Sequence, residues 1–357
     1  MTFQRFRTPK SGVHAIAAAC AAALIIAQCG CGNNAHSSDV IRGEDYLLNT
    51  HCEIAIYDIG GRGSESVQDG KIVIQEAFQY ARSLENLLSR TIPASDVSAV
   101  NKSSANDPVR IGPDAVAVIE KGLHYSEVSG GLFDITIGAL AELWDFSGLH
   151  PAVPAQSDID RAVSSVGYKT IQLSDGEVTK QNGDTHIDLG GIAKGYIADR
   201  TKAFLEQQGV SAALINFGGN VVVLGNKTEG TSWVIGVEKP FTGDEGDASV
   251  RQLSGEISVY SGSVVTSGVY ERKFTQGGIL YHHILDPATG FPRESDLLSA
   301  TVIGPMSVDC DALSTTCLML GAQKAFELVE SLEGYEAVLI GRNGKITCTA
   351  GALFTPY

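Results

Sequence analysis

Two residues in the last fifth of the chain have the spacing and the chemistry of a metal site. Asp311 and Thr315 are four positions apart in the apolar segment 310–320, and residues four apart share one face of an α-helix. A carboxylate and a hydroxyl suit Mg²⁺, which prefers oxygen ligands and takes few of them from protein. Ser314 adds a further hydroxyl to the same turn. Helix capping by Asp309 or Asp311 is the structural alternative.

A pair of histidines is the second candidate for chemistry. The segment YHHILDPATGFP, residues 281–292, places His282 and His283 at the end of an apolar strand, three residues before an Asp-Pro turn. Side chains alternate along a strand, so only one of the two can face a given cleft. A neutral imidazole is well suited to take a proton from a hydroxyl near neutral pH. The alternative is a hairpin corner whose histidines face solvent.

Glycine-rich turns could bring the backbone close to a ligand. In DLGGIAKGYIADR (188–200), an apolar strand, a glycine pair and a helix would aim backbone N–H groups at a phosphate, with Lys194 adding positive charge. The spacing is that of neither a Walker loop nor a dinucleotide fingerprint. In GGLFDITIGALAELWDF (130–146), Asp134 could accept hydrogen bonds from a base or ribose. Tight turns, including a plain hairpin turn at 218–220, and a helix cap at Asp134 are the alternatives.

The elements that position these residues are helices and short strands in separate runs. Apolar residues at helical spacing predict helices over 71–90, 114–128, 157–166, 192–208, 310–320 and 322–332. Strands are predicted at 45–58, 212–217, 221–224, 233–238, 256–260, 281–285, 299–303, 337–340 and 345–348. Strands follow strands without steady alternation with helices, which favours an α+β fold with a largely antiparallel or mixed sheet.

The amino end has the layout of an export signal. A basic stretch with Arg5, Arg7 and Lys10 precedes an apolar run at 15–27 that is short for a membrane span. The run ends in IIAQCGCG, and a cysteine at that place is typical of a bacterial lipoprotein signal. A plainly secreted protein is the alternative.

The two cysteines at the end of this run predict a lipid anchor. Cys31 follows a small glycine and is the preferred lipidation site, while Cys29 has the better aliphatic residue upstream and remains open. An anchor would hold the protein on the outer, extracytoplasmic face of the bacterial plasma membrane, or on the periplasmic side of an envelope membrane. The expected divisions are a signal peptide at 1–31, a polar tether at 32–43 and a single catalytic domain at 44–357.

Charge and cysteine usage exclude two classes of protein. The 357 residues carry a net charge of −15, and removal of 1–31 leaves 23 basic and 41 acidic residues, a net charge of −18. Such a chain will not bind nucleic acid by phosphate attraction, and a phosphate ligand would need a cation or a local positive site. The cysteines after the signal lack the spacing of a zinc site or disulfide scaffold, although one disulfide stays open: Cys52, Cys310, Cys317 and Cys348.

Taken together, these stretches resemble the ApbE family of flavin transferases, which move FMN from FAD onto a Ser or Thr of a target protein. The stretches that occur in the family's order are GLFDITIGALAELWDF, DLGGIAKGYIADR, LINFGGN, TSGVYERKF, YHHILDPATGFP and DALSTT, with a weaker match in SRTIPASDVSAVN. The resemblance covers nearly all of the chain after the signal. It implies a two-lobed α+β fold with packed helices and an FAD cleft between the lobes.

The resemblance also implies roles for single residues. Asp311, Thr315 and the backbone carbonyl of Ala193 correspond to Mg²⁺ ligands, and His283 corresponds to the histidine that activates the acceptor hydroxyl. Residues on or beside flavin-contacting positions are Leu48, Arg90, Phe133, Asp134, Ile135, Gly190, Lys194, Tyr196 and Ile284. The chain departs from the family at Leu48-Asn49-Thr50, where Met-Gly-Thr is usual, and at Arg90-Thr91, which replaces an aromatic residue.

The activity that the resemblance implies is Mg²⁺-dependent transfer of FMN from FAD to a Ser or Thr hydroxyl, with release of AMP. FAD is then a substrate, and the partner is an acceptor flavoprotein of an extracytoplasmic electron-transfer system. Two alternatives remain open: an FAD pyrophosphatase that yields FMN and AMP at the same site, and a non-enzymatic flavin-binding lipoprotein. The second would not need a histidine together with an Asp/Thr pair.

Overall fold

The computed structural model describes residues 40–59, 65–227, 231–241 and 252–357. The predicted signal peptide and the candidate lipidation sites Cys29 and Cys31 lie outside these residues. Within the described ranges, no helix has the length and apolar character needed to span a membrane.

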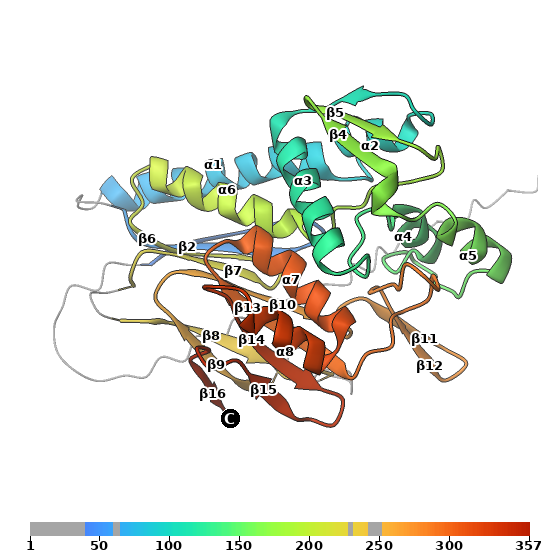
Figure 1. The fold of residues 1–357 in the computed structure, drawn as a ribbon. Coiled ribbons are helices and arrows are strands. Elements are labelled where there is room, and N and C mark those ends of the chain that lie inside the picture. The colour runs from blue at the N-terminus through green and yellow to red at the C-terminus, as the bar shows by residue number, and fades with distance from the viewer. Residues whose placement is uncertain (1–39, 60–64, 228–230, 242–251) are drawn as a thin grey trace, which may run out of the picture.

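The centre of the molecule is an eight-stranded sheet in which every neighbouring pair of strands is antiparallel (Figure 1). Its order is β1-β2-β6-β7-β10-β13-β14-β15. The bounds are β1 Ile41–Leu47, β2 Thr50–Asp58, β6 Ala212–Phe217, β7 Asn220–Leu224, β10 Gly262–Gly268, β13 Leu297–Gly304, β14 Glu336–Gly341 and β15 Ile346–Cys348.

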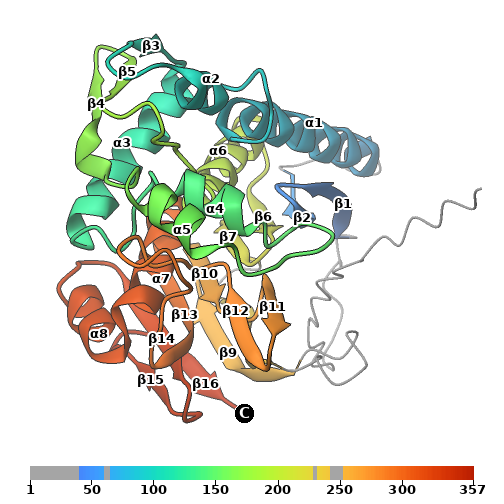
Figure 2. The same ribbon diagram turned by 90° about the vertical axis from the view of Figure 1, so that its right-hand side faces the viewer.

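Helices cover one face of this sheet and a second, smaller sheet covers the other (Figures 1 and 2). Ile215 and Val222 point into the helix-side core, whereas Leu214 and Val223 point into the core between the sheets. Burial on both faces explains why β6 and β7 read as continuous apolar runs. The helices are α1 Glu65–Leu88, α3 Pro113–Val128, α6 Ala193–Gln207, α7 Ser307–Leu320 and α8 Ala322–Glu330, and the smaller sheet comprises β8 Trp233–Glu238, β9 Leu253–Val259 and β16 Phe354–Pro356.

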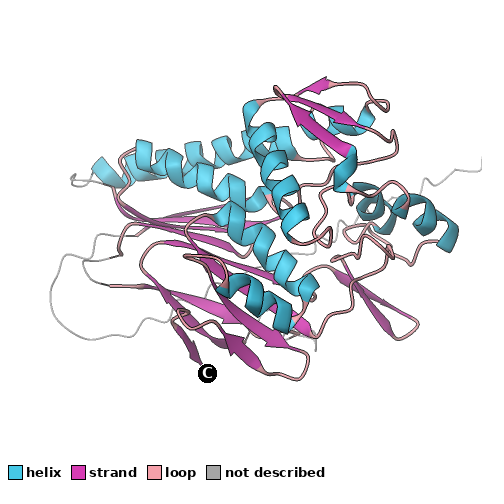
Figure 3. Ribbon diagram, in the orientation of Figure 1, coloured by secondary structure: helices cyan, strands magenta, loops and turns pink. Residues whose placement is uncertain are grey.

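Two smaller units flank the helix layer (Figure 3). In one, Trp144 packs among the rings of Phe146, Phe274, Tyr281 and Phe291, which fixes the β11–β12 hairpin beneath α4 and α5. This unit comprises α4 Gly138–Trp144, α5 Gln156–Val163, β11 Lys273–Gln276 and β12 Ile279–His282. The other comprises α2 Asp96–Lys102, β3 Val109–Arg110, the 3₁₀ helix Tyr168–Thr170, β4 Ile171–Ser174 and β5 Glu177–Lys180.

The α+β class is confirmed, and so are most helices and strands, with some boundaries corrected. The single strand predicted at 45–58 is wrong, because β1 and β2 form a hairpin that turns at Leu48 and Asn49. Both turn residues have positive φ, 57° and 55°, a conformation that non-glycine residues rarely adopt, so a turn was not expected at Leu48-Asn49. The β structure also begins at Ile41, before the predicted domain start at residue 44. Helix α2 and six strands were not predicted: β3, β4, β5, β10, β11 and β16.

Candidate active site

Helices α6 and α7 meet at a glycine contact that places the predicted metal ligands together. A Cβ added to Gly195 would lie 2.2 Å from the Ser307 carbonyl oxygen and 2.8 Å from the Asp311 Cβ. The buried Asp311 carboxylate accepts a hydrogen bond from the Gly195 N–H at 2.9 Å and lies 3.4 Å from the Lys194 Nζ. Asp311 therefore lies at the first turn of α6, the turn that begins with Ala193.

A serine that the sequence analysis did not select extends this row of oxygen atoms. The Ser267 Oγ, near the end of β10, lies 3.1 Å from the Thr315 Oγ1 and 2.8 Å from the Ser314 Oγ. The described residues hold no cluster of three His, Cys, Asp or Glu that could bind a metal. A cation here would thus be held by one carboxylate with hydroxyl and carbonyl oxygens, a donor set that suits Mg²⁺.

The acids of α7 do not cap their own helix. The backbone N–H groups of Ser307 and Val308 donate to the Asp199 carboxylate, both at 2.9 Å. Asp309 instead accepts hydrogen bonds from Lys121, Tyr125 and Tyr335. The capping alternative for Asp309 and Asp311 is therefore wrong, and Asp311 keeps its carboxylate at the junction with α6.

His283 follows directly after β12 and is held by one backbone carbonyl. The backbone N–H of His283 donates to the carbonyl oxygen of Arg272 at 3.0 Å, and the ring Nδ1 lies 3.3 Å from the same oxygen. Burial, and then the charge of Arg272, lowers the pKa of His283 to about 3, and the charge of Lys194 acts in the same direction. The ring is thus neutral near pH 7. It is also close enough to Lys194, whose Nζ lies beside the Asp311 carboxylate, for the charge of that lysine to act on its pKa. His282 is buried, so the two histidines face different surroundings, as expected.

Glu271 is a further acid in this neighbourhood that sequence reasoning missed. Burial raises its pKa to about 7, the charges of Lys194 and Arg272 oppose the shift, and Asp311 reinforces it. Glu271 is exposed and His283 is partly exposed, so both are accessible from solvent. The only sequence signal was its place after TSGVY, which does not separate it from an ordinary surface acid.

The glycine loop before α6 gathers several of the predicted flavin-binding residues. The Asp188 carboxylate accepts from the Gly190 N–H at 2.7 Å and from the Arg90 Nε at 2.6 Å. A Cβ on Gly191 would lie 2.9 Å from the Phe133 ring, so this ring packs directly on the loop. Arg90, Phe133 and Gly190 thus form one group at the entrance to α6, next to Lys194.

The side chains of Asp134 and Ile135 are buried and contact other protein groups. One Asp134 oxygen accepts from both the N–H and the hydroxyl of Thr136, and the other accepts from the Tyr168 N–H. The helix-cap alternative is wrong, since α4 begins at Gly138 without a side-chain cap. The Ile135 side chain is buried against Gly122 of α3.

The remaining predicted contacts lie at the edges of this group. The Tyr196 hydroxyl donates to the Asp114 carboxylate of α3 at 2.6 Å, which ties α6 to α3. Leu48 lies in the β1–β2 turn, and its N–H donates to the Glu85 carboxylate at 2.8 Å. Ile284, next to His283, is buried.

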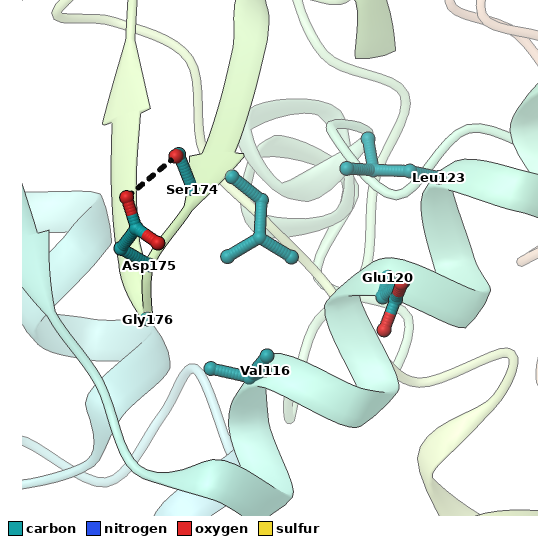
Figure 4. A pocket seen from close by; sticks show the side chains of 7 residues that line it. Val116, Glu120, Leu123, Ser174, Asp175 and Gly176 are labelled. Carbon is teal, nitrogen blue, oxygen red and sulfur yellow. Dashed lines mark hydrogen bonds between the residues drawn. The ribbon is translucent and has the colours of Figure 1, made fainter.

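Two surface cavities stand out, and neither is lined by Asp311, Thr315 or His283. One, of about 340 Å³, lies between Val116, Glu120 and Leu123 of α3 and the β4–β5 turn (Figure 4). The other, of about 770 Å³, lies beside β12 and includes His282 and Arg342.

Comparison with known proteins identifies the class to which this fold and site belong. Residues 48–339 match the ApbE family. FAD:protein FMN transferase of Klebsiella pneumoniae is 36% identical over 271 residues, which cover 75% of this chain and 82% of that protein. FAD:protein FMN transferase of Treponema pallidum is 30% identical over 346 residues, 92% of each chain. The crystal structure of the ApbE protein from Thermotoga maritima superposes with a TM-score of 0.76 at 30% identity, covering 87% of this chain and 97% of that one.

The class is that of flavin transferases, α+β enzymes that carry out group transfer. The chain belongs to the ApbE family.

Proposed function

We propose that this protein transfers FMN from FAD to a Ser or Thr hydroxyl of a target flavoprotein, with Mg²⁺ as cofactor and AMP as the second product. The observation that supports this most directly is the junction of α6 and α7. There the Asp311 carboxylate lies beside Lys194 and on the same helix as Thr315. The charge of Lys194 also acts on the neutral ring of His283.

The residues divide the reaction between them. The acceptor hydroxyl oxygen bonds to the phosphorus on the FMN side of the pyrophosphate, the bond from that phosphorus to the bridging oxygen breaks, and AMP leaves with the bond's electron pair. His283 takes the hydroxyl proton, a step that contributes roughly 10²–10⁴-fold in typical enzymes. Phosphoryl transfer depends mainly on positioning and positive charge, and Lys194 supplies a fixed positive charge.

Asp311, Thr315 and the Ala193 carbonyl would hold the Mg²⁺, with Ser267 orienting the Thr315 hydroxyl. When bound, the ion supplies Lewis-acid stabilisation of pyrophosphate charge. Without such positive charge, an anionic dinucleotide would meet a strongly acidic protein.

We further propose that the protein works outside the cytoplasm, tethered by a lipid on Cys31 or Cys29, and that its acceptor belongs to an extracytoplasmic electron-transfer system. The basic and apolar amino-terminal run supports this location. Water could replace the acceptor hydroxyl, because His283 keeps exposed surface, and the enzyme would then release FMN as a pyrophosphatase.

The test is covalent flavin labelling. The purified protein is incubated with FAD, Mg²⁺ and extracytoplasmic proteins from cells that lack its gene, and flavin fluorescence is read from a denaturing gel. Mass spectrometry identifies the labelled protein and measures AMP and free FMN. Transfer predicts one or more fluorescent bands with matching AMP. Free FMN with no labelled protein identifies the pyrophosphatase, and flavin binding with no AMP identifies a carrier.

Two variants test the assigned roles. His283→Ala should lose transfer by roughly 10²-fold or more while it still binds FAD, whereas His124→Ala, on the exposed surface of α3, should act as wild type. Asp311→Ala should lose the Mg²⁺-dependent turnover. Labelling at the wild-type rate by His283→Ala would contradict the assignment of His283 as the base. Full activity of the wild-type protein in excess EDTA would contradict the proposed metal site.

A further inference from the structure

We propose that the outer edge of β12, next to His283, is the docking strand for an extended segment of the acceptor protein, the segment that carries the modified hydroxyl. This inference rests on the proposed transfer function and adds to it the place and the manner in which the partner binds.

The hairpin register leaves main-chain groups of β12 facing outward. Lys273 pairs with His282, and Phe274 pairs with Tyr281. The His283 N–H donates to the Arg272 oxygen, so this pair is a hydrogen-bonded one. Because hydrogen-bonded and non-bonded pairs alternate in an antiparallel ladder, the N–H and C=O groups of Leu280 and His282 point away from β11.

These outward groups have no strand partner in the part of the chain that the structure describes. Strand β12 pairs with β11 alone, and no backbone hydrogen bond joins Leu280 or His282 to a neighbouring segment. A strand edge of this kind is a template for pairing with another chain. Proteins that recognise extended peptides use it by adding the peptide as a further strand.

A groove lies along this edge. Beyond His283 the chain turns, and the Arg293 N–H donates to the Ile284 oxygen at 2.8 Å. Toward Leu280, strand β12 and the segment 291–296 are no longer paired. A cavity of about 770 Å³ lies between β12, residues 291–296 and Arg342. The volume is in the range of pockets that enclose a bound ligand.

A buried ring atom indicates what the groove binds. His282 is 5% exposed, and its Nδ1 has no hydrogen-bond partner among the described residues. The ring's hydrogen bond with the Arg293 backbone therefore involves the other nitrogen, and burial lowers the pKa of His282 to about 4. In this neutral ring the Nδ1 is an acceptor. An ionised carboxylate has only acceptors to offer it, whereas a polypeptide brings N–H donors.

The position of the groove relative to the base fits a segment that delivers a hydroxyl. His283 is the residue that follows His282, and residues along a strand are about 3.3 Å apart. A segment paired with Leu280 and His282 therefore ends within one or two residues of the His283 backbone, where Arg293 takes over the edge by pairing with Ile284. Because successive side chains of the added strand alternate between the two faces, a residue adjacent to the paired ones presents its side chain on the face of the His283 ring. Recognition through main-chain groups would tolerate different flanking sequences around the hydroxyl residue.

The experiment uses two proline substitutions on opposite edges of the same hairpin. Leu280→Pro removes the outward N–H on the groove side, and Thr275→Pro removes the outward N–H on the far edge of β11. Leu280 and Thr275 face each other in a non-bonded pair, so neither N–H takes part in β11–β12 pairing. Proline is tolerated at such edge positions. The probe is the acceptor protein identified by the labelling assay, and its transfer rate is measured against its concentration.

We expect Leu280→Pro to raise the KM for the acceptor by roughly 3–10-fold, the effect of one main-chain hydrogen bond, with FAD binding unchanged. Thr275→Pro should keep the wild-type KM. In the wild-type protein, a synthetic peptide of about ten residues centred on the modified residue should slow hydrogen exchange at Leu280 and His282 but not at Thr275. This second measurement does not depend on how the proline variants fold.

The outcomes separate the two proposals. If wild-type protein transfers FMN but both proline variants keep its KM, or the peptide leaves the Leu280 and His282 amides unprotected, docking on β12 is wrong and the transferase function stands. If wild-type protein labels no acceptor, the transferase function is wrong and the docking inference falls with it.

Discussion

The close contact between α6 and α7 gives a quantitative test of how the site is held together. At Gly195 a Cβ would lie 2.2 Å from a backbone oxygen, that of Ser307. Cβ atoms essentially never come closer than 3.0 Å to another heavy atom, so Gly195→Ala requires the two helices to separate by about 1 Å. The carbonyl belongs to the first residue of α7 and cannot rotate away as a flexible side chain would.

The size of the effect follows from two opposing terms. Overpacking of this kind destabilises by about 1–3 kcal/mol, while alanine favours a helix interior by about 1 kcal/mol over glycine. We expect a net loss of about 1–2 kcal/mol in the free energy of unfolding, since the contact is with backbone. The shift also pulls the Gly195 N–H from the Asp311 carboxylate, and a misplacement of about 1 Å can lower a catalytic rate by roughly 10²-fold.

The assay combines urea unfolding with the rate of FMN transfer. Gly70→Ala is the matched control, because its Cβ would meet the terminal methyl group of Ile41, 2.4 Å away, which can rotate aside. We expect this control to be near wild type in stability and activity. If Gly195→Ala is as stable and as active as Gly70→Ala, the contact between the helices is not what positions Asp311.

Two further predictions concern the base and the helix that carries the metal ligands. Because the folded pKa of His283 is lowered, the ring stays neutral below its ordinary pKa of about 6.5, so the acid limb of kcat should lie below that pH, and a half-loss of kcat near pH 6.5 would contradict this environment. As the pH falls, His283 is protonated in the unfolded chain at a higher pH than in the folded protein, which favours the unfolded chain. The contribution of His283 to the free energy of unfolding should therefore fall as the pH drops below about 6.5. Asp199→Ala should lower the free energy of unfolding by about 1–2 kcal/mol, because two N–H groups of α7 lose their cap, with a smaller loss for Asp199→Asn; equal losses in urea unfolding would contradict the capping role.

The sequence by itself determined features that depend on local spacing. The helical period over 114–128 and 192–208 predicted α3 and α6 within one residue at each end, since apolar periodicity reports which face of a helix is buried. The glycine pair at 218–219 predicted the β6–β7 turn, where both residues have positive φ, 62° and 92°. The spacing of Asp311 and Thr315 placed both on one helix, and the order of the motifs indicated the family.

Only the tertiary structure decided which of these side chains are available for chemistry. The sequence could not show that both oxygens of Asp134 are occupied by Thr136 and Tyr168, or that Asp199 caps α7 and leaves Asp311 at the α6 junction. Ser267 reaches Thr315 only because β10 packs beside α7. Hydrogen bonds between residues distant in the chain depend on how elements pack, and local periodicity carries no information about that packing. For the same reason, the edge of β12 that has no strand partner among the described residues became visible only in the tertiary structure, which pairs β12 with β11 alone.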